Sequence, residues 1–167
     1  GFVLHDIWLE NSSDEYLNVM KACLKQLVLL ESHEGDCIFW READASDRYN
    51  LKKNWASAMS LGECMSFYLR MYQITKNEEI LKKCHKIYQS STILVKDNGV
   101  KIIDKKGDWW LEEYPSSPSS FVLNGFIYAV FGLVDYHRIT GKKEVEHDLN
   151  KYFHTLKTNI HRYNIGY

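Results

Sequence analysis

The sequence has few prolines, and its cysteines do not show the spacing of a metal site. Only two prolines, Pro115 and Pro118, occur among its 167 residues, and both lie in one short stretch. No two cysteines form a Cys-x-x-Cys pair, and no histidine pairs with them at the spacing of a zinc site. Three cysteines within helical patterns are best explained as small buried thiols, namely Cys23, Cys64 and Cys84. The sequence therefore predicts no metal site and implies no cofactor.

Long apolar runs and an excess of one charge are also absent. No apolar run reaches the ~18 residues of a membrane-spanning helix, and no secretory signal is present. The 21 basic and 22 acidic residues give a net charge of −1 without a basic block. This balance argues against a nucleic-acid partner and gives no support to a membrane-surface role. The chain begins at Gly1 rather than Met, so we expect a fragment of a longer protein. The sequence does not indicate the cellular compartment of that protein.

What the sequence does contain is helical periodicity. Apolar residues recur every three to four positions over about 14–32, 55–73, 78–95, 121–138 and 144–160. Two of these helices end in the same turn, at Ile74-Thr75 and Ile139-Thr140, and each precedes a more charged helix. Such repetition describes stacked αα-hairpins. We therefore expect a mainly α fold over residues 1–167, a single helical domain that forms part of an (α/α) toroid, with a small β-hairpin.

Residues 34–53 separate the first two helices and predict a long loop with a short strand at Cys37–Trp40. Loops of this length often border a functional site. Arg41, Arg48 and Lys52 lie in the loop and could face an anionic sugar, although ordinary solvated charge is the commoner role.

Two short β features are expected between the third and fourth helices. Asn98-Gly99 lies between apolar runs, which is a hairpin signal. A further strand at Trp109–Tyr114 is expected to pair with Val100–Ile103 across the turn at 105–107.

The stretch 109–128 brings polar groups to the start of a helix. Pro115 pushes Tyr114 out of the helical region, so this tyrosine should be extended or in a turn. Ser119 or Ser120 can cap the helix that follows. Glu112 and Glu113 would then be presented beside Tyr114 on an ordered turn, where functional groups often gather.

This stretch also carries a resemblance. Residues 109–136, WWLEEYPSSPSSFVLNGFIYAVFGLVDY, resemble the C-terminal domain of D-glucuronyl C5-epimerases. The family pattern is an acidic pair, Tyr-Pro, a Ser/Thr-Pro segment and Ser-(Phe/Tyr)-Val-Leu-Asn-Gly-Phe. A weaker match is Trp55–Gly62, which departs from the family's Trp-Tyr-Ser-Ala-Met-(Ala/Ser)-Gln-Gly at Ala56 and Leu61. The resemblance covers about residues 51–167.

The resemblance implies epimerisation of glucuronate to iduronate within a polysaccharide. Tyr114 would act as proton donor or acceptor, and Glu113 would orient it or serve as the partner base. The resemblance, the aromatic and polar character of the motif and, for Arg41, a positive charge in the long loop suggest six substrate-binding residues: Trp109, Trp110, Glu112, Asn124, Arg41 and Tyr163. We expect Trp109, Trp110, Glu113 and Tyr114 to line a cleft shared with the start of the helix near Trp55.

The expected partners are a uronate-containing polysaccharide, the rest of the parent chain and a second copy in a homodimer. Residues 163–167 resemble the start of a segment in which the family carries further tyrosines, so we expect the fragment alone to be inactive.

Other functions remain open at this point. The (α/α) toroid also hosts polysaccharide lyases and glycoside hydrolases, and a fold does not fix the reaction. A noncatalytic carbohydrate-binding domain is a further alternative. The motif could also be purely structural, with the two glutamates binding backbone groups and Tyr114 packing on the prolines.

Overall fold

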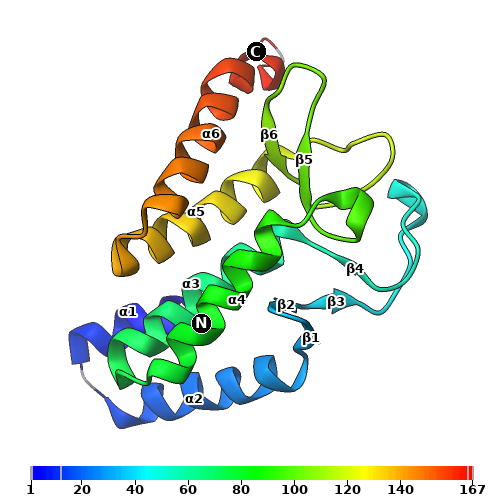
Figure 1. The fold of residues 1–167 in the computed structure, drawn as a ribbon. Coiled ribbons are helices and arrows are strands. Elements are labelled where there is room, and N and C mark those ends of the chain that lie inside the picture. The colour runs from blue at the N-terminus through cyan, green and yellow to red at the C-terminus, as the bar shows by residue number, and fades with distance from the viewer. Residues whose placement is uncertain (1, 12, 165, 167) are drawn as a thin grey trace.

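A computed structural model describes residues 2–11, 13–164 and 166. The described residues form a mainly helical fold, as the sequence predicts (Figure 1). The helices are α1 (Phe2–Asn11), α2 (Asp14–Leu29), α3 (Ala58–Thr75), α4 (Glu78–Thr92), α5 (Leu123–Thr140) and α6 (Lys143–Asn159). Short 3-10 helices lie at Asp47–Tyr49, before α3, at Val95–Asp97, after α4, and at Ile160–Tyr163, after α6. None of the described helices is long and apolar enough to cross a membrane.

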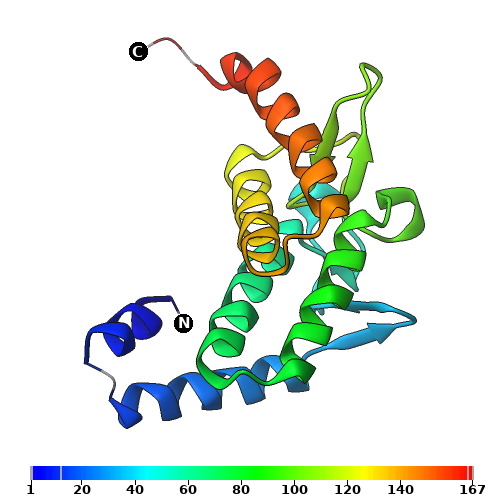
Figure 2. The same cartoon turned by 60° about the vertical axis from the view of Figure 1, so that its left-hand side comes forward.

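The helices pair in chain order as α1–α2, α3–α4 and α5–α6, which confirms the predicted αα-hairpins (Figure 2). The two Ile-Thr turns have the same geometry. The hydroxyl of Thr75 donates to the Met71 carbonyl, and that of Thr140 donates to the Tyr136 carbonyl, both at 2.8 Å. The next residue, Lys76 or Gly141, is left-handed and ends the helix. The repeated Ile-Thr pair in the sequence therefore marks the C-terminal end of a helix each time.

Helices α3 and α5 form the centre of the fold. Their backbones meet at Gly62 and Gly132, where an added side chain on either glycine would overlap the backbone of the other helix. Glycine removes the Cβ atoms that would separate the two helices. The core around this crossing is built from large buried side chains, including Leu61, Met65, Phe126, Leu133 and Tyr136.

Three antiparallel two-stranded sheets connect the helices. They pair β1 (Ser32–Glu34) with β2 (Cys37–Phe39), β3 (Arg41–Glu42) with β4 (Trp55–Ala56), and β5 (Lys101–Ile103) with β6 (Trp109–Leu111). The strand predicted at 37–40 and the hairpin across 105–107 are both confirmed, with Ile102 opposite Trp110. The 109–128 stretch thus leaves a small sheet and enters α5.

The hairpin predicted at Asn98-Gly99 is wrong. Val95–Asp97 forms a 3-10 turn, and Leu94 pairs with Lys101 in a parallel bridge rather than an antiparallel one. Asn98 does adopt the left-handed conformation, at φ 62°. Gly99 is needed for a different reason, because a Cβ there would collide with the Ile93 carbonyl.

Helix α1 was not expected, and α2 ends at Leu29 rather than near position 32 because Ser32 starts β1.

Candidate functional site

Glu112 fastens the turn that joins β6 to α5. Its carboxylate lies 2.9 Å from the Ser120 backbone nitrogen, 2.6 Å from the Ser120 hydroxyl and 3.3 Å from the Phe121 nitrogen. Burial raises the pKa of the Glu112 carboxyl, while the donors from Ser120 and Phe121 oppose that shift. Ser120 therefore does not cap α5, whose N-cap residue is Val122. Glu112 is buried and fixes the turn from inside.

Glu113 lies against α5 at Gly125. A Cβ on Gly125 would overlap the Glu113 side chain, so the glycine makes the space that this carboxylate occupies. Glu113 is 9% exposed, and its Oε2 atom has no hydrogen-bond partner among the described residues. A buried carboxylate oxygen without a donor is costly unless something else satisfies it. The described residues therefore leave this buried carboxylate oxygen without a donor.

Tyr114 is half-buried within an aromatic cluster. Its ring stacks on Tyr49 with centroids 3.9 Å apart and lies 5.5 Å from the ring of Trp55. Hydrogen bonding to Glu113 is the main cause that raises the pKa of the Tyr114 hydroxyl, and the Arg48 charge opposes it. The phenol is therefore protonated at neutral pH and can donate a proton.

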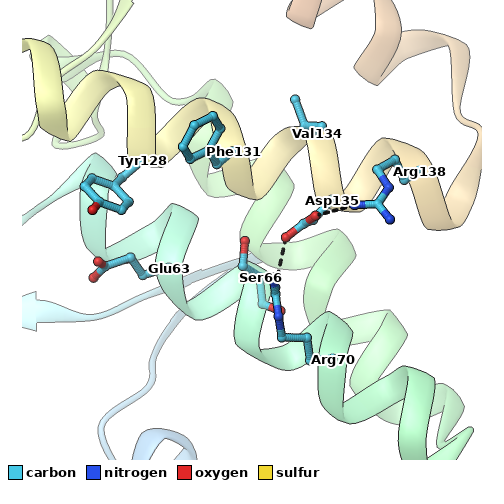
Figure 3. A pocket seen from close by; sticks show the side chains of 8 residues that line it. All are labelled: Glu63, Ser66, Arg70, Tyr128, Phe131, Val134, Asp135 and Arg138. Atoms are coloured by element: carbon cyan, nitrogen blue, oxygen red, sulfur yellow. Dashed lines mark hydrogen bonds and ion pairs between the residues drawn. The ribbon is translucent and has the colours of Figure 1, made fainter. Parts of the chain in front are cut away.

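A groove lies between α3 and α5 (Figure 3). It has a volume of about 360 Å³, and Glu63 and Tyr128 face each other across it. Burial, and then the charge of Glu113, raise the pKa of the Glu63 carboxyl. Further along, Arg70 pairs with Asp135 at 3.0 Å. Glu63 thus links the groove electrostatically to Glu113, although Tyr114 does not line it.

The two tryptophans lie away from Tyr114. Trp110 is 1% exposed and packs against Phe121 and Phe126, with centroids at 4.9 and 5.1 Å. Trp109 turns toward α6, and the Lys101 ammonium covers its ring at 3.2 Å. The single cleft expected to contain both tryptophans together with Tyr114 is therefore not formed, whereas the expected proximity of Tyr114 to Trp55 is found.

Of the other three predicted binding residues, two are held by hydrogen bonds within the chain and one is exposed. Arg41 donates to Glu34 at 2.7 Å and to the Asn98 carbonyl at 2.9 Å, so its guanidinium joins two loops. Tyr163 donates to the Phe121 carbonyl at 2.5 Å and helps to fix the start of α5. Asn124 is exposed rather than in a buried stripe. Ile165 and Tyr167, from the segment that resembles the family's tyrosine-containing region, lie outside the described residues.

Sequence reasoning missed Tyr49, Glu63 and Tyr128. Glu63 follows the family-like stretch that ends at Gly62, and the crossing of α3 with α5 brings it beside Tyr128. Tyr49 lies in the loop expected to border a site, but no periodicity marked it. The described residues include no group of His, Cys, Asp and Glu suited to a metal ion.

Fold and site together define a protein of stacked helical hairpins with a tyrosine–carboxylate pair on a rigid proline-containing turn. A family model described as the D-glucuronyl C5-epimerase C-terminus matches residues 34–167, and the chain belongs to this family. A D-glucuronyl C5-epimerase of Caenorhabditis elegans is 40% identical over 85 residues, which are 51% of this chain and 14% of that protein. An uncharacterized protein of Methanocaldococcus jannaschii is 27% identical over 132 residues, 77% of this chain and 43% of that protein. The chain thus spans less than half the length of either relative.

Proposed function

We propose that the protein containing this chain epimerises glucuronate at C5 within a polysaccharide, with Tyr114 and Glu113 on one face of the sugar. The observation that supports this most directly is the pairing of a protonated Tyr114 hydroxyl with the buried Glu113 carboxylate. Family membership provides the reaction class, and the site provides the groups.

The reaction is a proton exchange at carbon. A base takes the C5 hydrogen as a proton, and the electron pair of the C–H bond delocalises into the neighbouring carboxylate as an enediolate. A second group returns a proton to the opposite face, which inverts the centre. Because the enediolate carries extra negative charge, donors must already be in place where that charge develops.

Tyr114 is assigned as the proton donor of this pair. The Glu113 carboxylate favours the protonated phenol, so Tyr114 is an acid rather than a base before reaction. Glu113 orients the Tyr114 hydroxyl, which hydrogen-bonds to it. Following the family resemblance, we assign the group on the opposite face to a tyrosine of the longer protein.

The aromatic cluster supports a sugar substrate. Tyr49 and Trp55 flank Tyr114, and the half-buried rings offer apolar faces beside a polar hydroxyl. Sugar rings combine C–H faces with hydroxyl edges, so such a surface matches both. This feature alone would also serve a noncatalytic carbohydrate-binding domain.

Glycoside hydrolysis is the second candidate because two carboxylates are coupled here. Burial and Glu113 raise the pKa of Glu63, and pairs of carboxyl groups with differing environments serve as acid and base in glycosidases. The Glu63 side chain lines the groove of Figure 3, where a sugar could reach it.

Product analysis tests these candidates. The natural full-length protein that contains this chain is incubated with a glucuronate polymer, and the products are examined by NMR. Epimerisation gives iduronate without chain cleavage. A new unsaturated uronate would indicate a lyase, and new reducing ends would indicate a hydrolase. Binding without any of these products would indicate a noncatalytic domain.

A further inference from the structure

A second hollow borders the turn that carries Tyr114. It has a volume of about 660 Å³ and is bounded by the β5–β6 hairpin, residues 117–121 and Arg162. The hairpin and the end of α6 stand side by side at the top of Figure 1. We call this hollow the basic basin, after the residues that define it: Ile102, Lys105, Lys106, Pro118, Phe121 and Arg162.

The rim of the basic basin carries three cations. Lys105, Lys106 and Arg162 are exposed, and none of them forms an ion pair within the described part of the chain. Asp104 is the acidic residue of the lining. Its carboxylate accepts from the backbone nitrogens of Lys106 at 2.8 Å and Asp108 at 3.0 Å, so it shapes the turn. The rim therefore keeps a net positive charge, in a chain whose overall charge is −1.

The floor of the basin is apolar. Phe121 is half-buried, and the Arg162 guanidinium lies 5.8 Å from the centre of its ring. Ile102 and Pro118 extend this surface. An apolar floor with a cationic rim suits a ligand that has C–H faces and carboxylates, which is the character of a uronate chain.

The basin and the candidate site share one rigid turn. Tyr114 lies at its beginning and Phe121 at its end, and the Glu112 carboxylate binds the backbone nitrogens of Ser120 and Phe121 from within. Tyr163, which follows Arg162 in the chain, donates its hydroxyl hydrogen to the Phe121 carbonyl. A ligand in the basin is therefore positioned by the same element that positions Tyr114.

We infer that the basic basin binds the carboxylates of polysaccharide residues that flank the one presented to Tyr114. This inference rests on the proposed function for its substrate class, an anionic uronate oligosaccharide. The basin increases the affinity for the polysaccharide and determines which of its residues lies at Tyr114. It takes no part in proton exchange. Because the rim is exposed, its contribution depends on ionic strength.

Binding of a glucuronate-containing octasaccharide to the natural full-length protein that contains this chain tests the inference. Calorimetric titrations compare the wild type with Lys105→Gln/Lys106→Gln, with Arg162→Gln and with a control pair on α2, Lys21→Gln/Lys25→Gln. We expect the basin variants to bind about tenfold more weakly at ~20 mM salt, with a smaller difference at ~500 mM. The control pair should bind as the wild type does. Circular dichroism checks that all variants are folded.

The inference would be overturned by basin variants that bind with wild-type affinity, by no binding of the octasaccharide to the wild type, or by equal binding of a carboxyl-reduced octasaccharide. Equal affinity for a single-stranded oligonucleotide would also overturn it, since the basin would then attract any polyanion. The proposed function is judged separately by iduronate formation. Iduronate with no effect of the basin variants refutes the basin alone, while basin-dependent binding without iduronate refutes the epimerase function alone.

Discussion

The Glu112 carboxylate lies 2.6 Å from the Ser120 hydroxyl, eight positions further along the chain. This contact closes the turn that contains Pro115 and Pro118. The side chains of Glu113 and Tyr114 take no part in it. One acidic residue of the Glu-Glu pair therefore binds the turn, whereas one carboxylate oxygen of its neighbour is buried without a hydrogen-bond partner among the described residues. The two glutamates differ because the first points into the turn and the second lies on Gly125.

Replacing Glu112 should destabilise the protein. Glu112→Gln keeps one acceptor oxygen but turns an amide donor toward the N–H groups of Ser120 and Phe121. We expect the free energy of unfolding to fall by ~1.5–3 kcal/mol, the usual range for hydrogen bonds to a charged group. Guanidinium denaturation measures the change. The exposed Glu10→Gln is the control, and equal stability of both variants would contradict the assigned role.

Gly62→Ala should also destabilise, although alanine normally favours a helix. On an open helix surface the change would stabilise by ~1 kcal/mol. Here the new methyl group would overlap the backbone of Tyr128 and Ala129 on α5. We therefore expect a loss of ~2 kcal/mol or more, measured by denaturation. The exposed Asn150→Ala on α6 should change stability by less than ~0.7 kcal/mol. An increase in stability for Gly62→Ala would show that α3 and α5 do not meet at this glycine.

Gly125→Ala tests the placement of Glu113. The added methyl group would occupy the volume of the Glu113 side chain and displace its carboxylate. In the natural full-length protein we expect C5 exchange to fall by about 10²-fold, as for an ~1 Å misplacement of a reacting group. Substrate affinity, measured by titration, should change much less. Normal turnover would mean that the position of Glu113 does not matter for the reaction.

His85 should make stability depend on pH. Its Nδ1 atom lies 3.1 Å from the Tyr136 hydroxyl and 3.2 Å from the Lys142 ammonium, so it must accept hydrogen bonds as a neutral ring. Burial, and then the charge of Lys142, lower the pKa of His85, while Glu144 and Asp36 oppose the shift.

The unfolded chain then takes up this proton before the folded one does. Stability should fall as pH drops from ~6.5, the unfolded value, through the lower folded pKa, and level off below it. Denaturation of the wild type and of His85→Gln between pH 7 and 5 measures this contribution, which the variant should lose. His154→Gln on the exposed face of α6 is the control and should keep the wild-type profile. An unchanged profile for His85→Gln would refute the prediction.

The helical hairpins could be predicted because each apolar stripe has a clear period and each Ile-Thr turn stops a helix. The β5–β6 pairing followed from short apolar runs on either side of a turn. Helix α1 was missed because its sequence, FVLHDIWLEN, mixes apolar and polar residues without one clear stripe. At Asn98-Gly99 a local turn signal competed with tertiary packing, and the close approach of Ile93 decided the outcome.

The site was only partly visible in the sequence. The motif itself pointed to Glu113 and Tyr114, and the second family-like stretch pointed to Trp55. Which glutamate binds the turn depends on side-chain directions that spacing does not specify. Trp110 was expected to line a cleft because it belongs to the same motif, but Phe121 and Phe126 cover it. Tyr49 joins the cluster through a loop whose path depends on the whole fold.

The most direct test of the account is solvent deuterium incorporation at C5 of newly formed iduronate by the Tyr114→Phe variant of the natural full-length protein. The substitution removes only the hydroxyl and leaves the stacking on Tyr49 in place. Tyr16→Phe, on α2, is the matched control. We expect Tyr114→Phe to lose at least ~10²-fold in exchange, the usual contribution of a positioned acid, while its unfolding curve and that of the control stay close to wild type. Exchange at the wild-type rate would contradict the account and make the turn a structural element.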